Sequence, residues 1–203
     1  MTEATGAQGR IVICGAELRP NGRFQRANQM AVALPARRRR ALITGITGQD
    51  GSYLTEPLLS KDHEEHGIKL RSNGFNTERV HPLISDWHEP NIRFFLHFGD
   101  LSDAISLSKL PYRLAPDEID LLGVQSHVRV SLDIPEFTGD STALGTSRLL
   151  DAIGESGSPA RFCTAANSEM FGPAHERLQT ESAPFRPRSR QACAKPYVLE
   201  VDP

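Results

Sequence analysis

The sequence contains little cysteine and no long apolar run, and its charges of the two signs nearly cancel. The three cysteines, Cys14, Cys163 and Cys193, are odd in number and lack metal-ligand spacing, which excludes a disulfide framework and predicts reduced thiols. No run approaches the roughly 18 apolar residues of a membrane-spanning helix, and the N-terminus lacks an apolar signal core. The 23 basic and 25 acidic side chains give a net charge of −2, which favours neither a nucleic-acid nor a membrane partner. We therefore expect a soluble, cytoplasmic protein.

The first forty residues differ in composition from the rest. Residues 1–10 are small and polar, residues 19–29 are polar, and residues 37–40 are four consecutive arginines. Such a run is typical of a localisation or phosphate-binding patch, and also of a solvated extension that precedes a strand. We favour the second interpretation, and predict a flexible extension over residues 1–40 followed by one domain over residues 41–203.

From residue 41 onward, short apolar runs alternate with helical spacings. The runs predict strands at residues 41–44, 66–70, 93–98, 118–122 and 161–164. Leucines at helical spacing predict helices over residues 52–61 and 142–156. Strands that alternate with helices predict an α/β fold, a doubly wound parallel sheet of the Rossmann type with helices on both faces.

Three glycines, Gly45, Gly48 and Gly51, lie between the first predicted strand and the first predicted helix. Glycines in this context allow a tight turn and let a pyrophosphate approach the amides of the helix N-terminus, although an ordinary glycine-rich turn is the alternative. An NAD site usually has a carboxylate at the end of the second strand. Here that position offers Arg71, 20 residues after Gly51, with Ser72 beside it. A cation next to a hydroxyl suits a 2′-phosphate, so the sequence favours NADP over NAD.

A series of short motifs then follows in order along the chain. They are residues 45–54, 66–68, 75–79, 99–103, 125–131, 145–146, 148–150, 168–172 and 187–189. Together these motifs resemble the GDP-mannose 4,6-dehydratases, a family of the extended short-chain dehydrogenase/reductases. The resemblance extends from about residue 38 to residue 197 and implies the N-terminal half of such a protein.

The resemblance implies a lyase of nucleotide-sugar metabolism that converts GDP-mannose to GDP-4-keto-6-deoxymannose with tightly held NADP. In the family, hydride passes from C4 of the sugar to the nicotinamide, water is lost across C5 and C6, and the hydride returns at C6. The positions that it assigns to the cofactor are Gly45, Ile46, Thr47, Gly48, Gln49, Asp50, Gly51, Arg71, Asp100, Leu101, Leu122, Gly123, Val124, Gln125, Ser126 and Lys195.

The resemblance assigns the catalytic chemistry to Ser168, Glu169 and Lys195. It places Ser168 beside the sugar, makes Glu169 the base that takes the C5 proton, and gives Lys195 the nicotinamide ribose. In the family, that lysine also lowers the pKa of a tyrosine four residues earlier, which is Gln191 here. Asn167 occupies the position of the family's Thr or Ser. An amide does not titrate, and a general acid–base group typically contributes about 10²–10⁴-fold, so we predict a large loss of activity.

The alternative function is therefore a catalytically inactive remnant that binds at most NADP or a full-length homologue. Family members continue for well over a hundred residues beyond the lysine helix. We accordingly expect a truncated or frameshifted Rossmann domain, an incomplete pocket for GDP-mannose, and a homo-oligomer surface on the lysine helix that is cut short.

Local departures also predict a weakened fold. Pro57 falls inside the first predicted helix, where proline costs about 3 kcal/mol or more. Asp62 stands where the family has a glycine that closes that helix, and a left-handed closing conformation is harder for Asp. Glu65 replaces an apolar residue of the family's second strand and, if buried, would be an unpaired charge or a protonated carboxyl. Residues 63–66, His-Glu-Glu-His, resemble a metal-binding tetrad, but we expect a polar turn there and no metal site.

Overall fold

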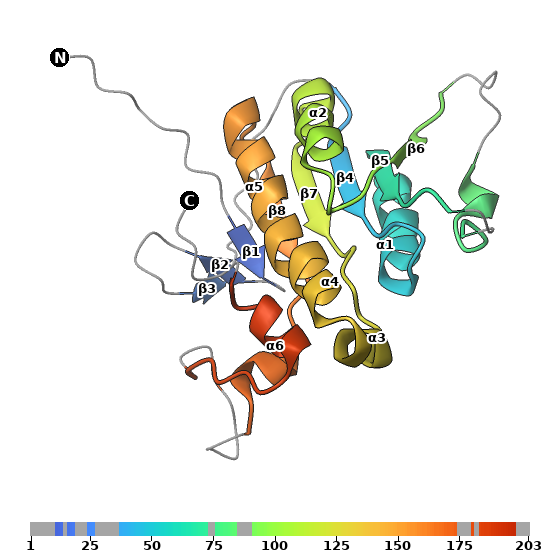
Figure 1. Ribbon diagram of the computed structural model, residues 1–203. Coiled ribbons are helices and arrows are strands. Elements are labelled where there is room, and N and C mark those ends of the chain that lie inside the picture. Colours follow the sequence, from blue (N-terminus) through green and yellow to red (C-terminus); the bar gives the residue numbers. More distant parts are fainter. Residues whose placement is uncertain are drawn as a thin grey trace.

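The computed structural model describes residues 11–13, 16–18, 24–26, 37–72, 76–84, 91–173, 180 and 183–197. Within these residues one eight-stranded sheet has the order β3-β2-β1-β8-β7-β4-β5-β6 (Figure 1). Its strands are β1 (Ile11–Ile13), β2 (Ala16–Leu18), β3 (Phe24–Arg26), β4 (Arg40–Thr44), β5 (Glu64–Lys69), β6 (Phe94–Phe98), β7 (Glu118–Leu121) and β8 (Arg161–Thr164). Neighbouring strands pair in parallel along the row β1-β8-β7-β4-β5-β6. At the other end of the sheet, β2 pairs antiparallel with both β1 and β3.

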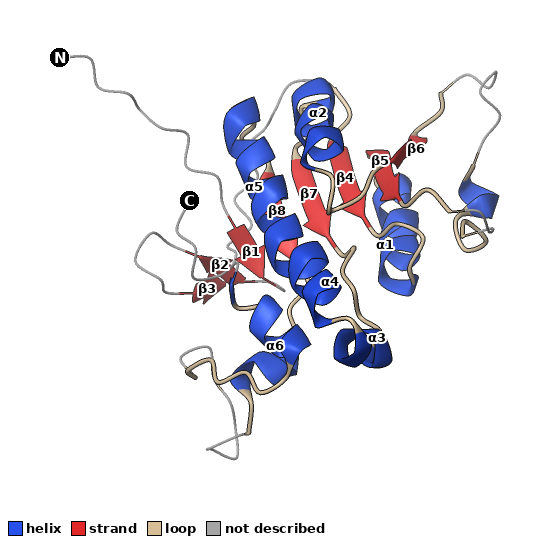
Figure 2. Ribbon diagram, viewed as in Figure 1, coloured by secondary structure: helices blue, strands red, loops and turns tan. Residues whose placement is uncertain are grey.

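Helices cover both faces of the sheet (Figure 2). They are α1 (Gln49–Ser60), α2 (Ala104–Leu114), α3 (Val128–Asp133), α4 (Pro135–Gly139), α5 (Gly145–Ser156) and α6 (Arg190–Ala194), with 3-10 turns η1 (His81–Leu83) and η3 (Ser168–Phe171) and a π-helical turn η2 (Asp140–Leu144). Helices α2 and α5 lie side by side on one face, and α1 covers the other. The predicted doubly wound α/β architecture is confirmed.

The alternation of side chains along β4 explains why the sheet has two apolar faces. Leu42 joins a core of α2, α5, β7 and β8 residues, whereas Ile43 joins a second core beneath α1. Both side chains are fully buried. A central strand of a parallel sheet is covered on both sides, so it reads as a continuous apolar run rather than an alternating one.

The five predicted strands correspond to β4–β8, with boundaries shifted by up to two residues. The predicted polar turn at residues 63–66 is wrong, because β5 begins at Glu64 and includes Glu65 and His66. Helix α2 was not predicted from the sequence, since Pro111 interrupts its pattern. The start of α2 is set by its N-cap residue Asp103, whose side chain accepts hydrogen bonds from the amides of Ile105 and Ser106.

The three expected weak points of the fold are present in the structure. Pro57 lies inside α1, and Asp62 closes that helix with a φ of 62°. Glu65 has an exposed fraction of 0%. These departures are therefore accommodated within the fold.

Arginines 37, 38 and 40 pair with carboxylates where the chain enters the sheet. Arg37 contacts Asp117 at 2.8 Å, Arg38 contacts Asp62 at 3.1 Å, and Arg40 contacts Glu64 at 2.9 Å. The arginine run thus leads directly into β4, as we expect if it ends an extension that precedes a strand.

Three short strands, β1–β3, lie within residues 1–40, the segment predicted as an extension. No strand was predicted there from the sequence. In the part of the chain that the structure describes, no helix has both the length and the apolar character required to cross a membrane.

Candidate functional site

The loop between β4 and α1 has a conformation that requires glycine at two positions. Gly45 has a φ of 69°, and a Cβ there would lie 2.6 Å from the Cα of Gly123. A Cβ on Gly51 would lie 2.5 Å from the Gly45 carbonyl oxygen. The Gly48 amide donates to that same carbonyl at 2.9 Å and closes the turn. Side chains at Gly45 or Gly51 would therefore push the loop out of place.

The N-terminus of α1 opens from this loop. The first amides of a helix have no intrahelical acceptor. Gly48, the N-cap residue, supplies no side-chain acceptor for them either. A Cβ on Gly48 would meet only the Gly45 carbonyl oxygen, at 3.2 Å. The space beside Gly48 thus allows a ligand to approach the backbone closely, which is how helix N-termini bind phosphate.

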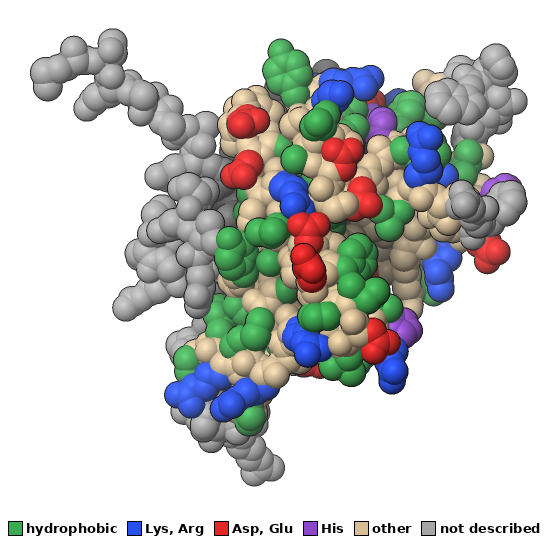
Figure 3. Space-filling view, viewed as in Figure 1, with side chains coloured by type: hydrophobic (Ala, Val, Ile, Leu, Met, Phe, Trp, Pro, Cys, Tyr) green, Lys and Arg blue, Asp and Glu red, His purple; other side chains and the backbone are tan. Residues whose placement is uncertain are grey.

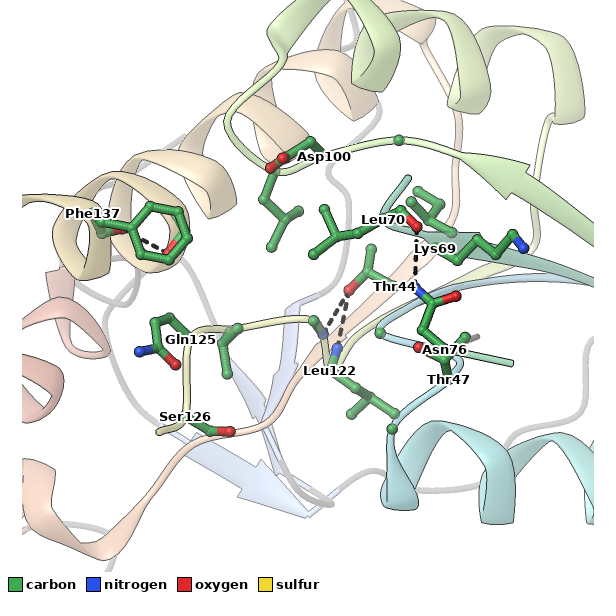
Figure 4. A pocket seen from close by; sticks show the side chains of 18 residues that line it. Thr44, Thr47, Lys69, Leu70, Asn76, Asp100, Leu122, Gln125, Ser126 and Phe137 are labelled. Atoms are coloured by element: carbon green, nitrogen blue, oxygen red, sulfur yellow. Dashed lines mark hydrogen bonds between the residues drawn. The ribbon is translucent and has the colours of Figure 1, made fainter. Parts of the chain in front are cut away.

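Thr44 holds the carboxyl ends of two neighbouring strands together. Its hydroxyl oxygen accepts hydrogen bonds from the amides of Leu122 at 3.1 Å and Gly123 at 2.9 Å (Figure 4). The side chain is 1% exposed. Sequence reasoning missed this residue, because a threonine that ends a buried strand has no distinctive pattern.

A cavity of about 410 Å³ lies at the carboxyl ends of β4, β5, β6 and β7 (Figure 4). Ligands of open α/β sheets bind at this edge. The predicted cofactor residues that line it are Gly45, Thr47, Gly48, Asp100, Leu101, Leu122, Gly123, Val124, Gln125 and Ser126. The lining residues that were not predicted are Thr44, Ile68, Lys69, Leu70, Asn76, Gly99, Phe137 and Ser141.

The other predicted cofactor residues lie outside this lining. Ile46 is fully buried in the core beneath α1, and Gln49, Asp50 and Gly51 form the first turn of that helix. Neither Arg71 nor Lys195 contributes to the cavity wall.

The cavity wall at the end of β5 is cationic. Lys69 lines the cavity, and its ammonium group lies 4.9 Å from the centre of the Phe98 ring. The Arg71 guanidinium lies over the same ring at 4.8 Å. Asp100, after β6, is the one carboxylate among the lining residues. The structure thus places two cations, and no acid, at the end of β5.

The predicted catalytic residues form a second group, on η3 and around α6. Ser168 and Glu169 are exposed on η3, and the Ser189 hydroxyl donates to the Glu169 carboxylate at 2.6 Å. Ser189 also caps α6 by accepting from the Ala192 amide. The Lys195 ammonium donates to the Ala165 carbonyl, directly after β8. Hydrogen bonds thus join Glu169 to Ser189 and hold Lys195 at the carboxyl end of β8.

The residues at the two departures from the family pattern lie in the same region. Gln191 is half-buried on α6, and the side-chain oxygen of Asn167 is buried without a hydrogen-bond partner. Neither they nor Ser168, Glu169 and Lys195 line the 410 Å³ cavity.

The histidines at residues 63 and 66 do not form a metal site. Strand alternation separates Glu65 from Glu64 and His66, so the four side chains cannot converge. His66 instead contacts Glu64 and His97, each at 3.0 Å. Burial lowers the pKa of His66, and burial together with His66 lowers the pKa of His97 to about 4. Among the described residues, no group of three potential ligands is suited to a metal ion.

Comparison with known protein families identifies this arrangement. The family model of GDP-mannose 4,6 dehydratase matches residues 42–201. The chain belongs to this family. Among curated members, it is 52% identical to the GDP-mannose 4,6-dehydratase of Yersinia enterocolitica over 80% of this chain and 44% of that protein. It is 50% identical to the GDP-mannose 4,6 dehydratase of Drosophila melanogaster over 77% of this chain and 40% of that protein.

Solved structures of other proteins share the fold. A UDP-Glc/GlcNAc 4-epimerase from Campylobacter jejuni aligns with a TM-score of 0.68 and 21% identity, over 80% of this chain and 47% of that chain. The Bordetella bronchiseptica enzyme WbmH, in complex with NAD+, aligns with a TM-score of 0.66 and 20% identity, over 79% of this chain and 51% of that chain. The chain therefore spans about half the length of the family members and structural neighbours that it matches.

Proposed function

We propose that this chain binds NADP in the cavity at the carboxyl ends of β4–β7. The glycine loop carries the proposal, because Gly45 and Gly51 hold a turn that leaves the N-terminus of α1 open beside Gly48. The pyrophosphate lies against these amides. Leu122, Gln125 and Ser126 line the opposite wall of the cavity and contact the rest of the cofactor.

The preference for NADP over NAD comes from the end of β5. An NAD site needs a carboxylate there for the ribose 2′-hydroxyl, whereas a 2′-phosphate needs a cation. Lys69 lies in the cavity wall, and Arg71 lies beside it over the shared Phe98 ring. Lys69 and Arg71 are therefore the cations that we propose for the 2′-phosphate.

An isothermal titration tests this selectivity. The unmodified chain binds NADP more tightly than NAD, and Arg71→Ala and Lys69→Ala each reduce that ratio by about tenfold, the loss of one charge-assisted contact. Lys61→Ala, an exposed cation after α1, is the matched control and leaves the ratio unchanged. Equal affinities for NADP and NAD in the unmodified chain would refute the assignment.

We propose GDP-mannose as the sugar nucleotide of this chain, because the family members that it matches are named GDP-mannose 4,6-dehydratases. A bound nicotinamide would supply the hydride acceptor and donor for that reaction. Glu169 is the group that removes a proton from the sugar, Ser168 lies beside the sugar, and Ser189 orients the Glu169 carboxylate through its 2.6 Å hydrogen bond. Lys195 is held by the Ala165 carbonyl at the end of β8, where it would meet the nicotinamide ribose.

Turnover by this chain is nevertheless strongly reduced or absent in our proposal. The Gln191 amide cannot exchange a proton where the family's tyrosine does, and the catalytic group does not line the cavity. A chromatographic assay of GDP-mannose conversion with NADP should therefore detect no product. Efficient conversion by the unmodified chain would overturn this part of the proposal and favour full dehydratase activity.

Self-association is the partner interaction that we propose. Figure 3 shows hydrophobic side chains gathered over α4 and its surroundings. The exposed apolar residues of this region are Val128, Leu132, Ile134, Phe137 and Leu144. Helix α6, the lysine helix, packs beside α4 and α3, so a second copy would cover all three helices. Leu132→Lys should convert such an oligomer to monomer in sedimentation analysis, and an unmodified chain that sediments as a monomer would contradict the proposal.

A further inference from the structure

The strand at the β8 edge of the parallel sheet comes from outside the family-matched residues. β1 pairs in parallel with β8, with Ile11 opposite Phe162 and Val12 opposite Cys163. The family model begins at residue 42, so β1 precedes it. β2 and β3 then continue the sheet in antiparallel fashion beyond β1 (Figure 1).

β1 occupies a definite position in the architecture. A doubly wound sheet has the strand order 3-2-1-4-5-6, in which all six strands are parallel. In this chain β6, β5, β4, β7 and β8 take the first five places, and β1 takes the sixth with the same direction. The sixth position, beside β8, normally belongs to the strand that follows β8 in sequence. In this chain it is occupied by β1, which precedes the family-matched residues.

The hydrogen bonds of β8 show which of its backbone amides a strand in the sixth position must pair with. The amides of Arg161 and Ala165 donate to the carbonyls of Asp117 and Leu121, at 3.0 and 3.2 Å, toward β7. Because successive residues of a strand point their amides to opposite sides, the amides of Phe162 and Thr164 point to the edge where β1 lies. Without β1, β8 would present an open row of backbone groups, which is a template for pairing with another chain.

We propose that β1, β2 and β3 act as an internal sixth-strand unit that occupies the β8 edge and excludes strands of other chains. β1 satisfies the outward amides of β8, and β2 and β3 move the open edge of the sheet away from the parallel core. The occupant of this edge is the chain's own segment rather than a second copy.

Amide hydrogen exchange on the full chain tests the pairing. Phe162 and Thr164 should exchange as slowly as Cys163, whose amide points toward β7. Val12→Pro should accelerate Phe162 and Thr164 by at least about tenfold while Cys163 keeps its protection. Gln25→Pro is the matched control on β3, which does not touch β8, and leaves all three amides protected. Unprotected Phe162 and Thr164 in the unmodified chain would overturn the proposal.

Cross-linking gives a readout that survives if Val12→Pro fails to fold. Val12→Cys, with Cys14 and Cys193 replaced by Ser, should link to Cys163 within one chain when a short bifunctional thiol reagent is added. Gln25→Cys in the same background should not form this link. A link between two chains would identify a second copy as the occupant, and no link from Val12→Cys would place β1 elsewhere; either result refutes the internal unit.

Discussion

At the scale of single residues, Glu65 is the main electrostatic weakness of the fold. It lies on β5 with an exposed fraction of 0%, and neither carboxylate oxygen has a hydrogen-bond partner. Burial raises the pKa of Glu65 to about 8, with Thr55 opposing the shift and Glu118 and Asp120 adding to it. Burial also raises the pKa of Asp120 to about 6. The interior therefore favours the protonated form of both groups.

This raised pKa predicts that stability falls as the pH rises. The unfolded chain releases the Glu65 proton near the ordinary glutamate pKa of 4.5, whereas the folded chain retains it until about pH 8. The contribution of this group is therefore greatest below pH 4.5 and is lost as the pH rises to 8, by about 3 to 5 kcal/mol in total. Urea unfolding between about pH 6 and about pH 9 should show that decline.

Glu65→Gln tests whether this carboxyl causes the decline. The variant should have a nearly flat unfolding free energy above about pH 7, because an amide carries no proton to lose and the buried histidines, whose pKa values are lowered, are then neutral in both states. Glu56→Gln, at an exposed position of α1, is the control and should keep the slope of the unmodified chain. An unchanged slope in Glu65→Gln would show that another group is responsible.

The glycine loop gives a second prediction at this scale. Gly45→Ala combines a left-handed φ of 69° with a Cβ 2.6 Å from the Gly123 backbone, so it should lower the unfolding free energy by about 2 kcal/mol or more and abolish NADP binding. Gly154→Ala on α5 meets nothing within 4 Å and should raise stability by about 0.5–1 kcal/mol. Thermal melts of both variants measure the contrast, and equal melting temperatures would contradict this account of the loop.

At the scale of elements, α1 is interrupted near its end by Pro57. Proline supplies no amide for the fourth carbonyl back, so Pro57→Ala should restore a helical hydrogen bond and raise the unfolding free energy by about 1–3 kcal/mol. Pro135→Ala is the comparison, since Pro135 opens α4, where proline needs no donor. Chemical denaturation should show a higher unfolding free energy for Pro57→Ala alone. An increase of similar size for Pro135→Ala would indicate an effect on the unfolded chain instead.

The strands of the parallel core were predictable where they are mostly apolar, as β4 and β6 are, whereas the polar start of β5 was missed by two residues. β8 matches its predicted bounds, and β4 differs from them by one residue. Asp62 was predictable as a left-handed residue because it follows a helix that needs a closing glycine. Helix α2 was not predictable, since tertiary packing of Leu107 and Leu110 overrides the break signal of Pro111.

The residues of the candidate site likewise include some that were predictable from the sequence and some that were not. The glycine loop has a sequence spacing, so Gly45, Thr47 and Gly48 were predicted and do line the cavity. Lining residues such as Lys69 and Phe137 come from different elements, and only the folded sheet brings them together. Arg71 carried the cofactor argument in the sequence, yet Lys69 is the cation that the structure places in the wall.

At the scale of the whole molecule, the fold positions one edge for ligand binding and leaves a second region for chemistry. The carboxyl ends of β4–β7 form the cavity, whereas Glu169 and Lys195 lie at the end of β8 and outside its wall. The chain spans about half the length of its relatives, and the side chains that we propose as catalytic are not among the residues that line the proposed cofactor cavity. We expect binding of NADP without turnover of GDP-mannose because Gln191, at the position of the family's tyrosine, cannot exchange a proton.

A thermal melt of the full chain with and without NADP tests this account most directly. A ligand that binds only the folded form adds about 2.7 kcal/mol of stability at about 100 times its Kd. We predict a single cooperative transition that moves to higher temperature with NADP and moves less with NAD at the same concentration. A transition that does not respond to NADP would contradict the proposal that the β4–β7 cavity is a cofactor site.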